Sequence, residues 1–245
     1  MCGRFVQTTR PEVLAELFDV AVTDPSVNDL VPRFNIAPSA LVAVIDADGT
    51  ARRLVTRRWG LVPRWAKDPS IAARLSNARS ETAWDRPSFR DSMRHGRCLV
   101  PIDGFYEWAP ATPDGPRTAS GRPAKRPHLF RSSGEAPLLL AGIGAEWSGP
   151  DHGASLRTVC LLTTAANALM APIHDRMPVI IDPDMAEVWL HAAPSEARDL
   201  LDHLLQPTSA TTLTEYEVGV EVNDARNESP NLITPVSDHP PTTLF

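Results

Sequence analysis

The sequence LVAVIDADGTARRLVTRR at residues 41–58 has the pattern of a β-hairpin, and it sets the class of fold that we expect. Its two strand-like runs, at 41–46 and 52–58, flank the turn signal Asp48-Gly49. An Asp-Gly pair between two such runs is a strong hairpin signal, because both residues tolerate the backbone angles of a tight turn. The segment therefore predicts two adjacent antiparallel strands.

Short apolar runs of the same kind recur along the chain, with a few helices between them. Further strands are predicted at 97–101, 105–108, 128–131, 138–147, 157–163 and 178–181. Helices are predicted at 11–18, 87–95, 183–190 and 195–205, with Gly96 ending the second and Ser195 capping the last. We expect one α+β domain over residues 1–236, built on a largely antiparallel, barrel-like β-sheet with a few flanking helices, and a tail at 237–245.

Residues 110–127 interrupt this pattern without ending it. They contain five prolines, two glycines and four basic residues, which predicts a surface loop. Because the strand pattern resumes directly afterwards, we expect a hairpin loop and not a linker between two domains.

The composition excludes several classes of protein. A chain of 245 residues with 42% apolar and 22% charged residues is neither a disordered segment, a collagen nor a disulfide-stapled miniprotein. No apolar run approaches the roughly 18 residues that span a bilayer, and the first residues lack the apolar segment of a signal peptide. Three cysteines do not make a disulfide framework. We expect a cytoplasmic protein with no membrane partner.

The formal net charge of −6 averages over two different parts of the chain. Residues 1–133 carry a net charge of +6, whereas residues 134–245 carry −12. Of the 24 basic residues 22 are arginine, which suits phosphate contacts and stacking on bases. A solvated basic face, or the codon bias of a GC-rich genome, explains the same excess.

Cys2 is the residue with the most distinctive chemistry. Removal of Met1, which is usual before a small second residue, would leave an α-amine and a thiol on one residue, with ordinary pKa values of about 8 and about 8.5. A 1,2-aminothiol condenses with an aldehyde to an imine, on which the thiol closes to a five-membered thiazolidine. Position alone also fits a cysteine that lies there by chance. Cys98 and Cys160 lie in apolar runs and are expected to be small buried residues.

Several separate motifs together resemble one family, the SOS-response-associated peptidases (SRAP). The motifs are MCGRF at 1–5, RFNIAP at 33–38, RWGLVPRW at 58–65, NARSET at 77–82, FYEW at 105–108, IHDRMP at 173–178 and NLITPV at 231–236. The resemblance implies the SRAP fold. It also implies a DNA-damage protein that crosslinks to abasic sites in single-stranded DNA through a thiazolidine at its N-terminal cysteine, with lyase-type Schiff-base chemistry and autopeptidase activity.

The resemblance also implies roles for three further residues. Glu107 would be the general acid and base, since apolar neighbours can bury its carboxyl group; by itself, a Glu between aromatic residues also fits the solvent-facing position of a strand. His174 would assist ring opening of the sugar or reversal of the crosslink, although a hydrogen bond to Asp175 explains it equally. Asn77 would hold the α-amine and a sugar hydroxyl, or it caps a turn.

DNA binding needs guanidinium groups along the phosphates and flat apolar surfaces under the bases. The matched motifs supply phosphate candidates, pocket-shaping residues and one stacking candidate: Arg4, Arg79 and Arg176; Asn35 and Pro38; and Trp65. Where relatives often carry a second aromatic residue after this tryptophan, the chain has Ala66, which weakens the prediction of a two-residue wedge.

Two other interpretations remain open from the sequence. Cys2, His174 and Glu107 also suit a thiol autopeptidase, and a non-catalytic reader of single strands or junctions would need none of this chemistry. The expected partner is single-stranded DNA with abasic sites, and the resemblance extends it to 3′ junctions; we expect a monomer. Scattered histidines and the absence of a Cys-x-x-Cys pair or a phosphate-binding glycine loop predict no metal and no cofactor.

Overall fold

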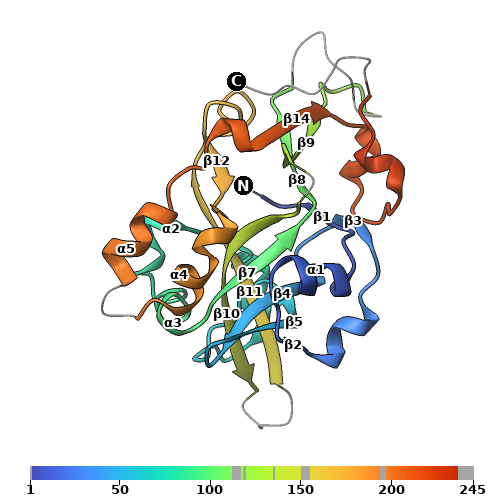
Figure 1. The fold of residues 1–245 in the computed structure, drawn as a ribbon. Coiled ribbons are helices and arrows are strands. Elements are labelled where there is room, and N and C mark those ends of the chain that lie inside the picture. Colours follow the sequence, from blue (N-terminus) through green and yellow to red (C-terminus); the bar gives the residue numbers. More distant parts are fainter. Residues whose placement is uncertain are drawn as a thin grey trace.

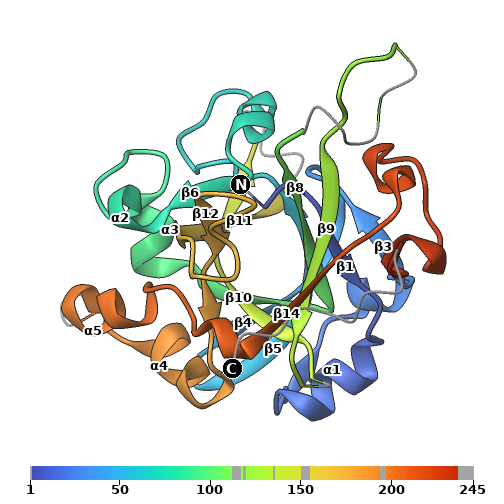
Figure 2. The ribbon, with the colours of Figure 1, turned by 90° about the horizontal axis from the view of Figure 1, so that it is seen from above.

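Five strands form a closed barrel in the computed structural model, which describes residues 2–111, 117, 120–134, 136–149, 155–193 and 197–236. The barrel strands are β4 (Leu41–Asp48), β5 (Ala51–Trp59), β7 (Arg97–Ile102), β10 (Leu138–Ser148) and β11 (Ser155–Ala165). Neighbours pair in antiparallel fashion in the order β5–β4–β7–β10–β11. A parallel pairing of β11 with β5, at Thr158–Arg58 and Val159–Trp59, closes the ring. Figure 2 looks onto this arrangement from above.

Both faces of the barrel strands are buried, which explains why these segments are apolar almost throughout. In β4, Val42 and Val44 join a cluster that contains Phe5 and Trp59. Ala43 and Ile45 alternate with them and join a second cluster that contains apolar side chains of the helices. The period of two in a strand thus divides one apolar run between two packed layers.

The β4–β5 hairpin predicted from the sequence is confirmed. The strands pair from Leu41–Arg58 to Asp48–Ala51, and Gly49 in the turn has a φ of 62°, a conformation that glycine adopts without strain.

A second, antiparallel sheet lies against the barrel. Its strands, in spatial order, are β14 (Leu213–Glu217), β9 (Arg126–Ser132), β8 (Gly104–Ala109), β1 (Phe5–Gln7) and β3 (Arg33–Ile36). The short β1 therefore lies inside this sheet, between β8 and β3. Because β1 is held on both sides, the residues just before it have fixed positions.

Short strands and helices complete the fold. The remaining strands are β2 (Val22–Thr23), β6 (Asn77–Arg79), β12 (Arg176–Pro178) and β13 (Ile180–Ile181). The α-helices are α1 (Pro11–Leu17), α2 (Ser80–Ala83), α3 (Arg90–His95), α4 (Ala186–His191) and α5 (Ala197–Leu204). In Figures 1 and 2, α2 to α5 lie together on one side of the barrel and α1 lies on the other.

The predicted α+β class and barrel-like sheet are confirmed, and several element boundaries differ from the sequence prediction; the helix expected at 183–190, for example, is α-helical only from Ala186. The strand expected at 178–181 is split at Val179, because β12 pairs with β11 whereas β13 pairs with β10. The helix expected at 87–95 begins only at Arg90, since residues 87–89 form turns. Ser195, the predicted cap, and the tail at 237–245 lie outside the described residues.

The proline-rich segment connects β8 to β9, which pair through Trp108–Pro127 and Ala109–Arg126. The segment between β8 and β9 is therefore a hairpin connection, and the last two residues of the predicted loop, Arg126 and Pro127, belong to β9. Its described residues are mostly exposed.

Gly96 lies between α3 and β7, where the backbone packs tightly against β10 of the barrel. A Cβ atom at this position would lie 2.1 Å from the carbonyl oxygen of Gly144, whose amide donates to Gly96 across 2.7 Å. We predict that Gly96→Ala lowers the free energy of unfolding by about 1–3 kcal/mol in urea denaturation. Gly134→Ala is the control, because its Cβ atom would meet only Ser132 Oγ at 3.6 Å. Equal stability of Gly96→Ala and wild type would contradict the packing.

Candidate active site and nucleic-acid interface

Cys2 is fully buried at the entrance to β1. It lies in the apolar cluster of Phe5 and Trp59, whose rings are 4.8 Å apart between centroids. Burial raises the pKa of the Cys2 thiol well above its ordinary range, and the negative charge of Glu107 raises it further. The thiol is therefore held in its neutral form until a base takes its proton.

Asn77 binds the backbone of Cys2. It begins β6, which runs parallel to β11 with Asn77 opposite Leu161. Its Nδ2 atom donates a hydrogen bond of 2.8 Å to the carbonyl oxygen of Cys2. A side chain 75 positions away in sequence thus fixes the orientation of the N-terminal residue.

Glu107 is buried in the middle of β8, with 4% of its surface exposed. Phe105 shares its face of the strand and packs in the cluster that holds Cys2, whereas Tyr106 and Trp108 face a different apolar cluster. The solvent-facing alternative does not apply to Glu107. Since its charge acts on the Cys2 thiol, the structure brings Cys2, Asn77 and Glu107 together.

His174 lies two residues before β12. In the sheet, β12 and β10 are the two neighbours of β11. Its Nδ1 atom accepts a 2.9 Å hydrogen bond from the amide of Arg176 and also lies 2.9 Å from a carboxylate oxygen of Asp175. One ring nitrogen serves only one of these contacts at a time: the neutral form accepts from the amide, and the protonated form donates to Asp175. The contact with Asp175 was anticipated from the sequence, whereas the hydrogen bond from the amide of Arg176 was not.

Arg79 and Arg176 lie at the ends of two strands that pair with β11. Arg79 is exposed and opposite Thr163, and Arg176 is opposite Ala165. The guanidinium of Arg176 forms a two-pronged ion pair with Glu81, with Nη2 2.8 Å from Oε2. This pairing lowers the pKa of the Glu81 carboxyl group.

Arg4 and Asn35 are joined to each other and to the chain near residue 222. Arg4 Nη1 donates to Asn35 Oδ1 at 2.7 Å and to the carbonyl oxygen of Val222 at 2.9 Å. Asn35, fully buried, donates to the carbonyl oxygens of Asp224 and Asn227, both at 3.0 Å. These contacts hold a late segment of the chain against β1 and β3, while the nearby Pro38 is exposed.

Trp65 lies apart from these residues, beside α3. Its ring is 58% exposed, and its Nε1 atom donates to the carbonyl oxygen of Pro87 at 3.2 Å. It borders an open hollow of about 760 Å³ that is also lined by Pro63, Arg64, Pro87, Ser88, Arg90, Asp91, Ser92 and Arg94. The hollow combines an exposed aromatic ring with three exposed arginines.

Ala66 does not add a second stacking surface. It is buried, and its carbonyl oxygen accepts a 2.7 Å hydrogen bond from Trp147 Nε1. Trp147 is itself buried against Ala66 and Val62. The residue after Trp65 therefore packs against the buried Trp147, and Trp65 offers one exposed ring without a second aromatic residue directly after it.

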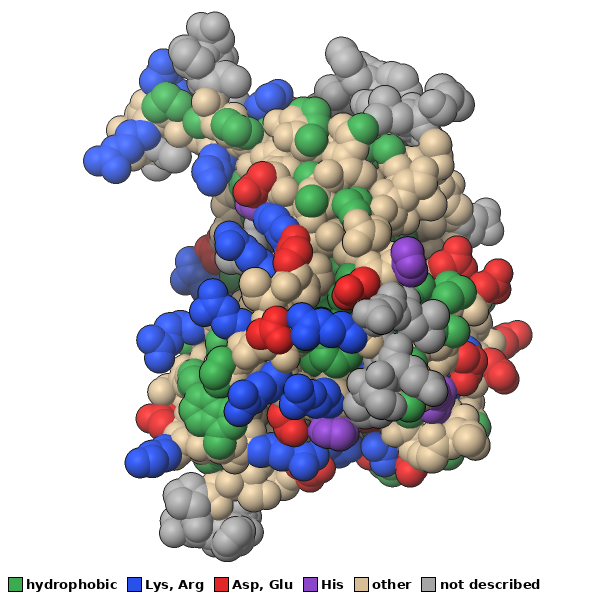
Figure 3. Space-filling model, turned by 90° about the vertical axis from the view of Figure 1, so that its left-hand side faces the viewer, with side chains coloured by type: hydrophobic (Ala, Val, Ile, Leu, Met, Phe, Trp, Pro, Cys, Tyr) green, Lys and Arg blue, Asp and Glu red, His purple; other side chains and the backbone are tan. Residues whose placement is uncertain are grey.

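Basic side chains gather on one part of the surface. Figure 3 views the side of the molecule that carries α2, α3 and α5, where Lys and Arg side chains surround an apolar patch and Asp and Glu gather toward the opposite edge. Arg90 and Arg94, one helical turn apart on α3, were not among the predicted site residues. Their spacing in the sequence was a usable signal, because residues i and i+4 share one face of a helix.

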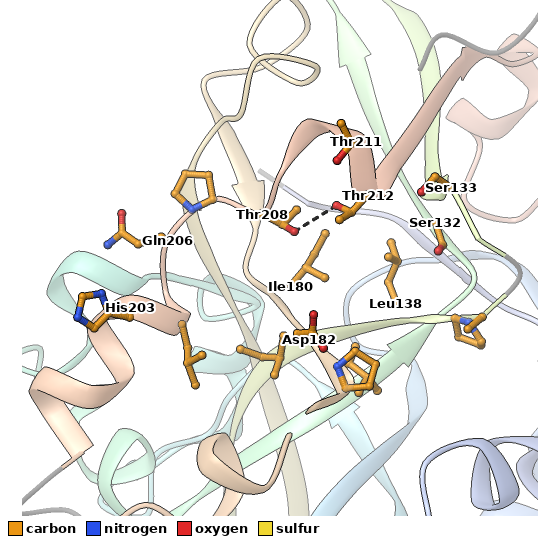
Figure 4. A pocket seen from close by; sticks show the side chains of 17 residues that line it. Ser132, Ser133, Leu138, Ile180, Asp182, His203, Gln206, Thr208, Thr211 and Thr212 are labelled. Atoms are coloured by element: carbon orange, nitrogen blue, oxygen red, sulfur yellow. Dashed lines mark hydrogen bonds between the residues drawn. The ribbon is translucent and has the colours of Figure 1, made fainter. Parts of the chain in front are cut away.

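A separate hollow of about 430 Å³ holds none of the predicted site residues. Figure 4 shows its lining from β9, β10, β13 and the segment after α5, including Leu138, Ile180 and the hydrogen-bonded pair Thr208 and Thr212.

Within the described ranges, no group of three or more His, Cys, Asp and Glu side chains is placed to hold a metal ion. None of the helices described is long and apolar enough to cross a membrane.

Comparison with known proteins identifies the family. The family model of the SOS response associated peptidases (SRAP) matches residues 1–225. Abasic site processing protein YoqW of Bacillus subtilis (strain 168) is 37% identical over 233 residues, which cover 95% of this chain and 99% of that protein. Abasic site processing protein YedK of Escherichia coli (strain K12) is 31% identical over 242 residues, which cover 96% of this chain and 100% of that protein.

A crystal structure of a protein from Bacteroides thetaiotaomicron has the same fold. Its TM-score is 0.79 at 23% identity, covering 96% of this chain and 100% of that one. From the family match and the two relatives, the chain belongs to the SRAP family.

Proposed function

We propose that this protein processes abasic sites by binding single-stranded DNA and forming a covalent thiazolidine between Cys2 and the open-chain aldehyde of the lesion. The relatives are named as abasic site processing proteins. The observation that carries the proposal for this chain is the fixation of Cys2 by Asn77 next to the charge of Glu107. Removal of Met1, which lies outside the described residues, exposes the α-amine that the reaction needs.

The reaction proceeds in one condensation, which releases one water, followed by one ring-closing addition. The α-amine of Cys2 adds to the aldehyde carbon, and the carbinolamine loses water to give an imine. The thiol then adds to the imine carbon, the electron pair of the C=N bond goes to nitrogen, and a proton is transferred from sulfur to nitrogen. No base has to be flipped out of the stack, because the lesion has none.

Glu107 serves both proton transfers in this scheme. As an acid it protonates the leaving hydroxyl of the carbinolamine, and as a carboxylate it accepts the thiol proton during ring closure. The raised pKa of the Cys2 thiol makes a base at this step necessary at neutral pH. Asn77 holds the Cys2 carbonyl, which orients both nucleophiles without adding a charge that would keep the amine protonated.

His174 assists the opening of the sugar ring and the reversal of the crosslink. The Nδ1 atom of its half-buried ring lies 2.9 Å from the amide nitrogen of Arg176 and 2.9 Å from a carboxylate oxygen of Asp175, and these contacts orient the imidazole.

The strand of DNA is held by arginines on both sides of the site and by Trp65. Arg79 is exposed for a phosphate contact, and Arg176 exchanges its exposed partner Glu81 for phosphate. Arg4 forms no ion pair with a carboxylate in the described ranges, and its guanidinium, hydrogen-bonded to Asn35, attracts the phosphate near the lesion, while the exposed Pro38 helps to shape the pocket. In this proposal the protein is a cytoplasmic monomer. It binds single strands, including those at 3′ junctions.

A denaturation-resistant adduct is the direct test of the crosslink. Wild-type protein incubated with single-stranded abasic DNA should give a shifted band on a denaturing gel, and Cys2→Ala should give none. Cys160→Ala, which removes a buried thiol in a different part of the core, should react like wild type. The crosslinking proposal is wrong if wild-type protein forms no adduct, or if Cys2→Ala forms one.

The role of Trp65 is tested on reversible binding, in a Cys2→Ala background. Trp65→Ala should weaken the affinity for single-stranded DNA by about 1–3 kcal/mol, because one base loses its stacking surface. Leu17→Ala, which shortens another half-exposed apolar side chain, on α1, should leave the affinity unchanged. Binding should fall steeply with salt. Equal affinities of Trp65→Ala and Leu17→Ala in titrations would assign stacking to another surface.

A thiol autopeptidase is the second candidate, and it is favoured by the charge of Glu107 acting on the Cys2 thiol and by the family's description. Its product would be the chain without Met1. Mass spectrometry of Glu107→Gln made in an aminopeptidase-free system distinguishes the cases: retention of Met1 in this variant but not in wild type supports autoproteolysis. Salt-dependent DNA binding without any adduct in wild type would instead support the non-catalytic reader.

A further inference from the structure

A further hollow, of about 340 Å³, lies where the β4–β5 turn meets the C-terminal ends of α3 and α4. The described residues that line it include four arginines, Arg53, Arg57, Arg94 and Arg97, and one carboxylate, Asp46. We call it the arginine hollow. With its two histidines neutral, its described lining carries a net charge of +3. The hollow of about 430 Å³, by contrast, has no Lys or Arg in its described lining. The arginine hollow therefore has the charge that attracts an anion.

Arg97 is the most buried arginine of this hollow, with 7% of its surface exposed. Its Nε atom donates to the carbonyl oxygen of Trp189 at 2.7 Å, and its Nη1 atom donates to that of Met93 at 2.8 Å. Its Nη2 atom donates to the carbonyl oxygen of Ala192. These acceptors are neutral, and Arg97 pairs with no carboxylate in the described ranges. Because a buried charge without an opposite charge is costly, a bound anion would stabilise it.

Asp46 supplies the one negative charge of the lining, and two arginines share it. Its carboxylate oxygens lie 3.0 Å from Arg53 Nε and 2.6 Å from Arg57 Nη2. Since one carboxylate offsets one guanidinium, this group of three keeps one positive charge in excess. The Arg53 side chain is 31% exposed and also lies 3.5 Å from the exposed Asp48. Arg53 thus has an outer part that an anion from solvent can reach, while Asp46 holds it in place.

Arg94 joins the arginine hollow to the hollow beside Trp65. It lies in the last turn of α3, is exposed, and forms no ion pair with a carboxylate of the described residues. It lines both hollows, and Arg90, one helical turn earlier, lines the one beside Trp65. Figure 3 shows Lys and Arg side chains between the apolar patch and the lower edge of this face. A DNA strand that stacks on Trp65 therefore meets further cations along α3 and beyond its end.

We propose that the arginine hollow is a second phosphate-binding site, which holds the sugar-phosphate backbone of the DNA strand beyond Trp65. Arg53 and Arg94, whose side chains reach solvent, donate to the phosphate oxygens. Arg57 and Arg97 are more buried, bind acceptors inside the protein and contribute charge. The inference rests on the proposed function, and it extends the path of the DNA to arginines that lie outside the matched motifs.

The test is reversible binding of abasic single-stranded DNA to the Cys2→Ala protein, measured against strand length and salt concentration. A short strand covers the lesion and the hollow beside Trp65, and two long strands are extended by about ten nucleotides at the 5′ or the 3′ end. Arg53→Gln should weaken the affinity for the long strand that reaches the arginine hollow by about threefold. It should also reduce the salt slope of that strand by about 0.7, and leave the affinity for the short strand unchanged.

Ala193→Glu tests the same hollow without removing an ion pair. Ala193 is exposed where it lines the hollow, so a carboxylate there should repel phosphate without disturbing the core. It should weaken binding of the same long strand as Arg53→Gln does, and Arg53→Lys, which keeps the charge, should retain most of the affinity. Arg10→Gln is the matched control: Arg10 is an exposed arginine just before α1, on the other side of the barrel, and its loss should leave the affinities for all three strands unchanged.

Unchanged affinity for both long strands in Arg53→Gln and Ala193→Glu would overturn the inference. Equal affinities for the short and long strands, together with binding of inorganic triphosphate that Ala193→Glu abolishes, would also overturn it, because the hollow would then serve a free phosphate compound. Absence of an adduct between wild-type protein and abasic DNA would instead overturn the crosslinking function. The two failures are distinguishable, because the hollow is judged on the difference between strand lengths in a protein that lacks the Cys2 thiol.

Discussion

The parallel pairing of β11 with β5 is the constraint on which the site depends. It closes the barrel at Thr158–Arg58 and Val159–Trp59, and it leaves the next part of β11 to pair with β6 on one edge and β12 on the other. The pairing thereby holds two strands with site residues against β11: β6 with Asn77 and Arg79, and β12 with Arg176. Trp59, at the end of β5, packs on Phe5 and fixes the entry of the N-terminus.

Burial fixes the position of Cys2 and also raises the pKa of its thiol. A cysteine on a mobile N-terminus would have a thiol with an ordinary pKa, whereas burial and the charge of Glu107 raise the pKa of this one, so the proposed reaction needs a base beside it. Glu107 on β8 is opposite His128 on β9, and His128 contacts Glu215 on β14. In the proposed reaction, the thiol becomes a nucleophile when the carboxylate of Glu107 accepts its proton, and the bound aldehyde supplies the imine carbon to which it adds.

Sequence reasoning identified the parts with a local signal and missed those that need the fold. Strong apolar periodicity located every barrel strand, and the unusual position of Cys2 indicated its chemistry. The short β1, β3 and β6 have no such periodicity, because neighbouring strands hold them in place. The pair of His128 and Glu215 joins residues 87 positions apart, and the mutual hydrogen bond of Arg4 and Asn35 joins residues 31 apart. Neither has a pattern in the sequence.

The central claim is that the amine and the thiol of Cys2 both bond to the lesion. Tandem mass spectrometry of the N-terminal peptide, after crosslinking, nuclease digestion and treatment with a thiol alkylating reagent under denaturing conditions, tests it most directly. The account predicts a peptide that begins at Cys2, carries the sugar remnant with the loss of one water, and has no alkylated thiol at Cys2. A sugar-bearing peptide whose Cys2 thiol is alkylated, or whose adduct is on another residue, would contradict it.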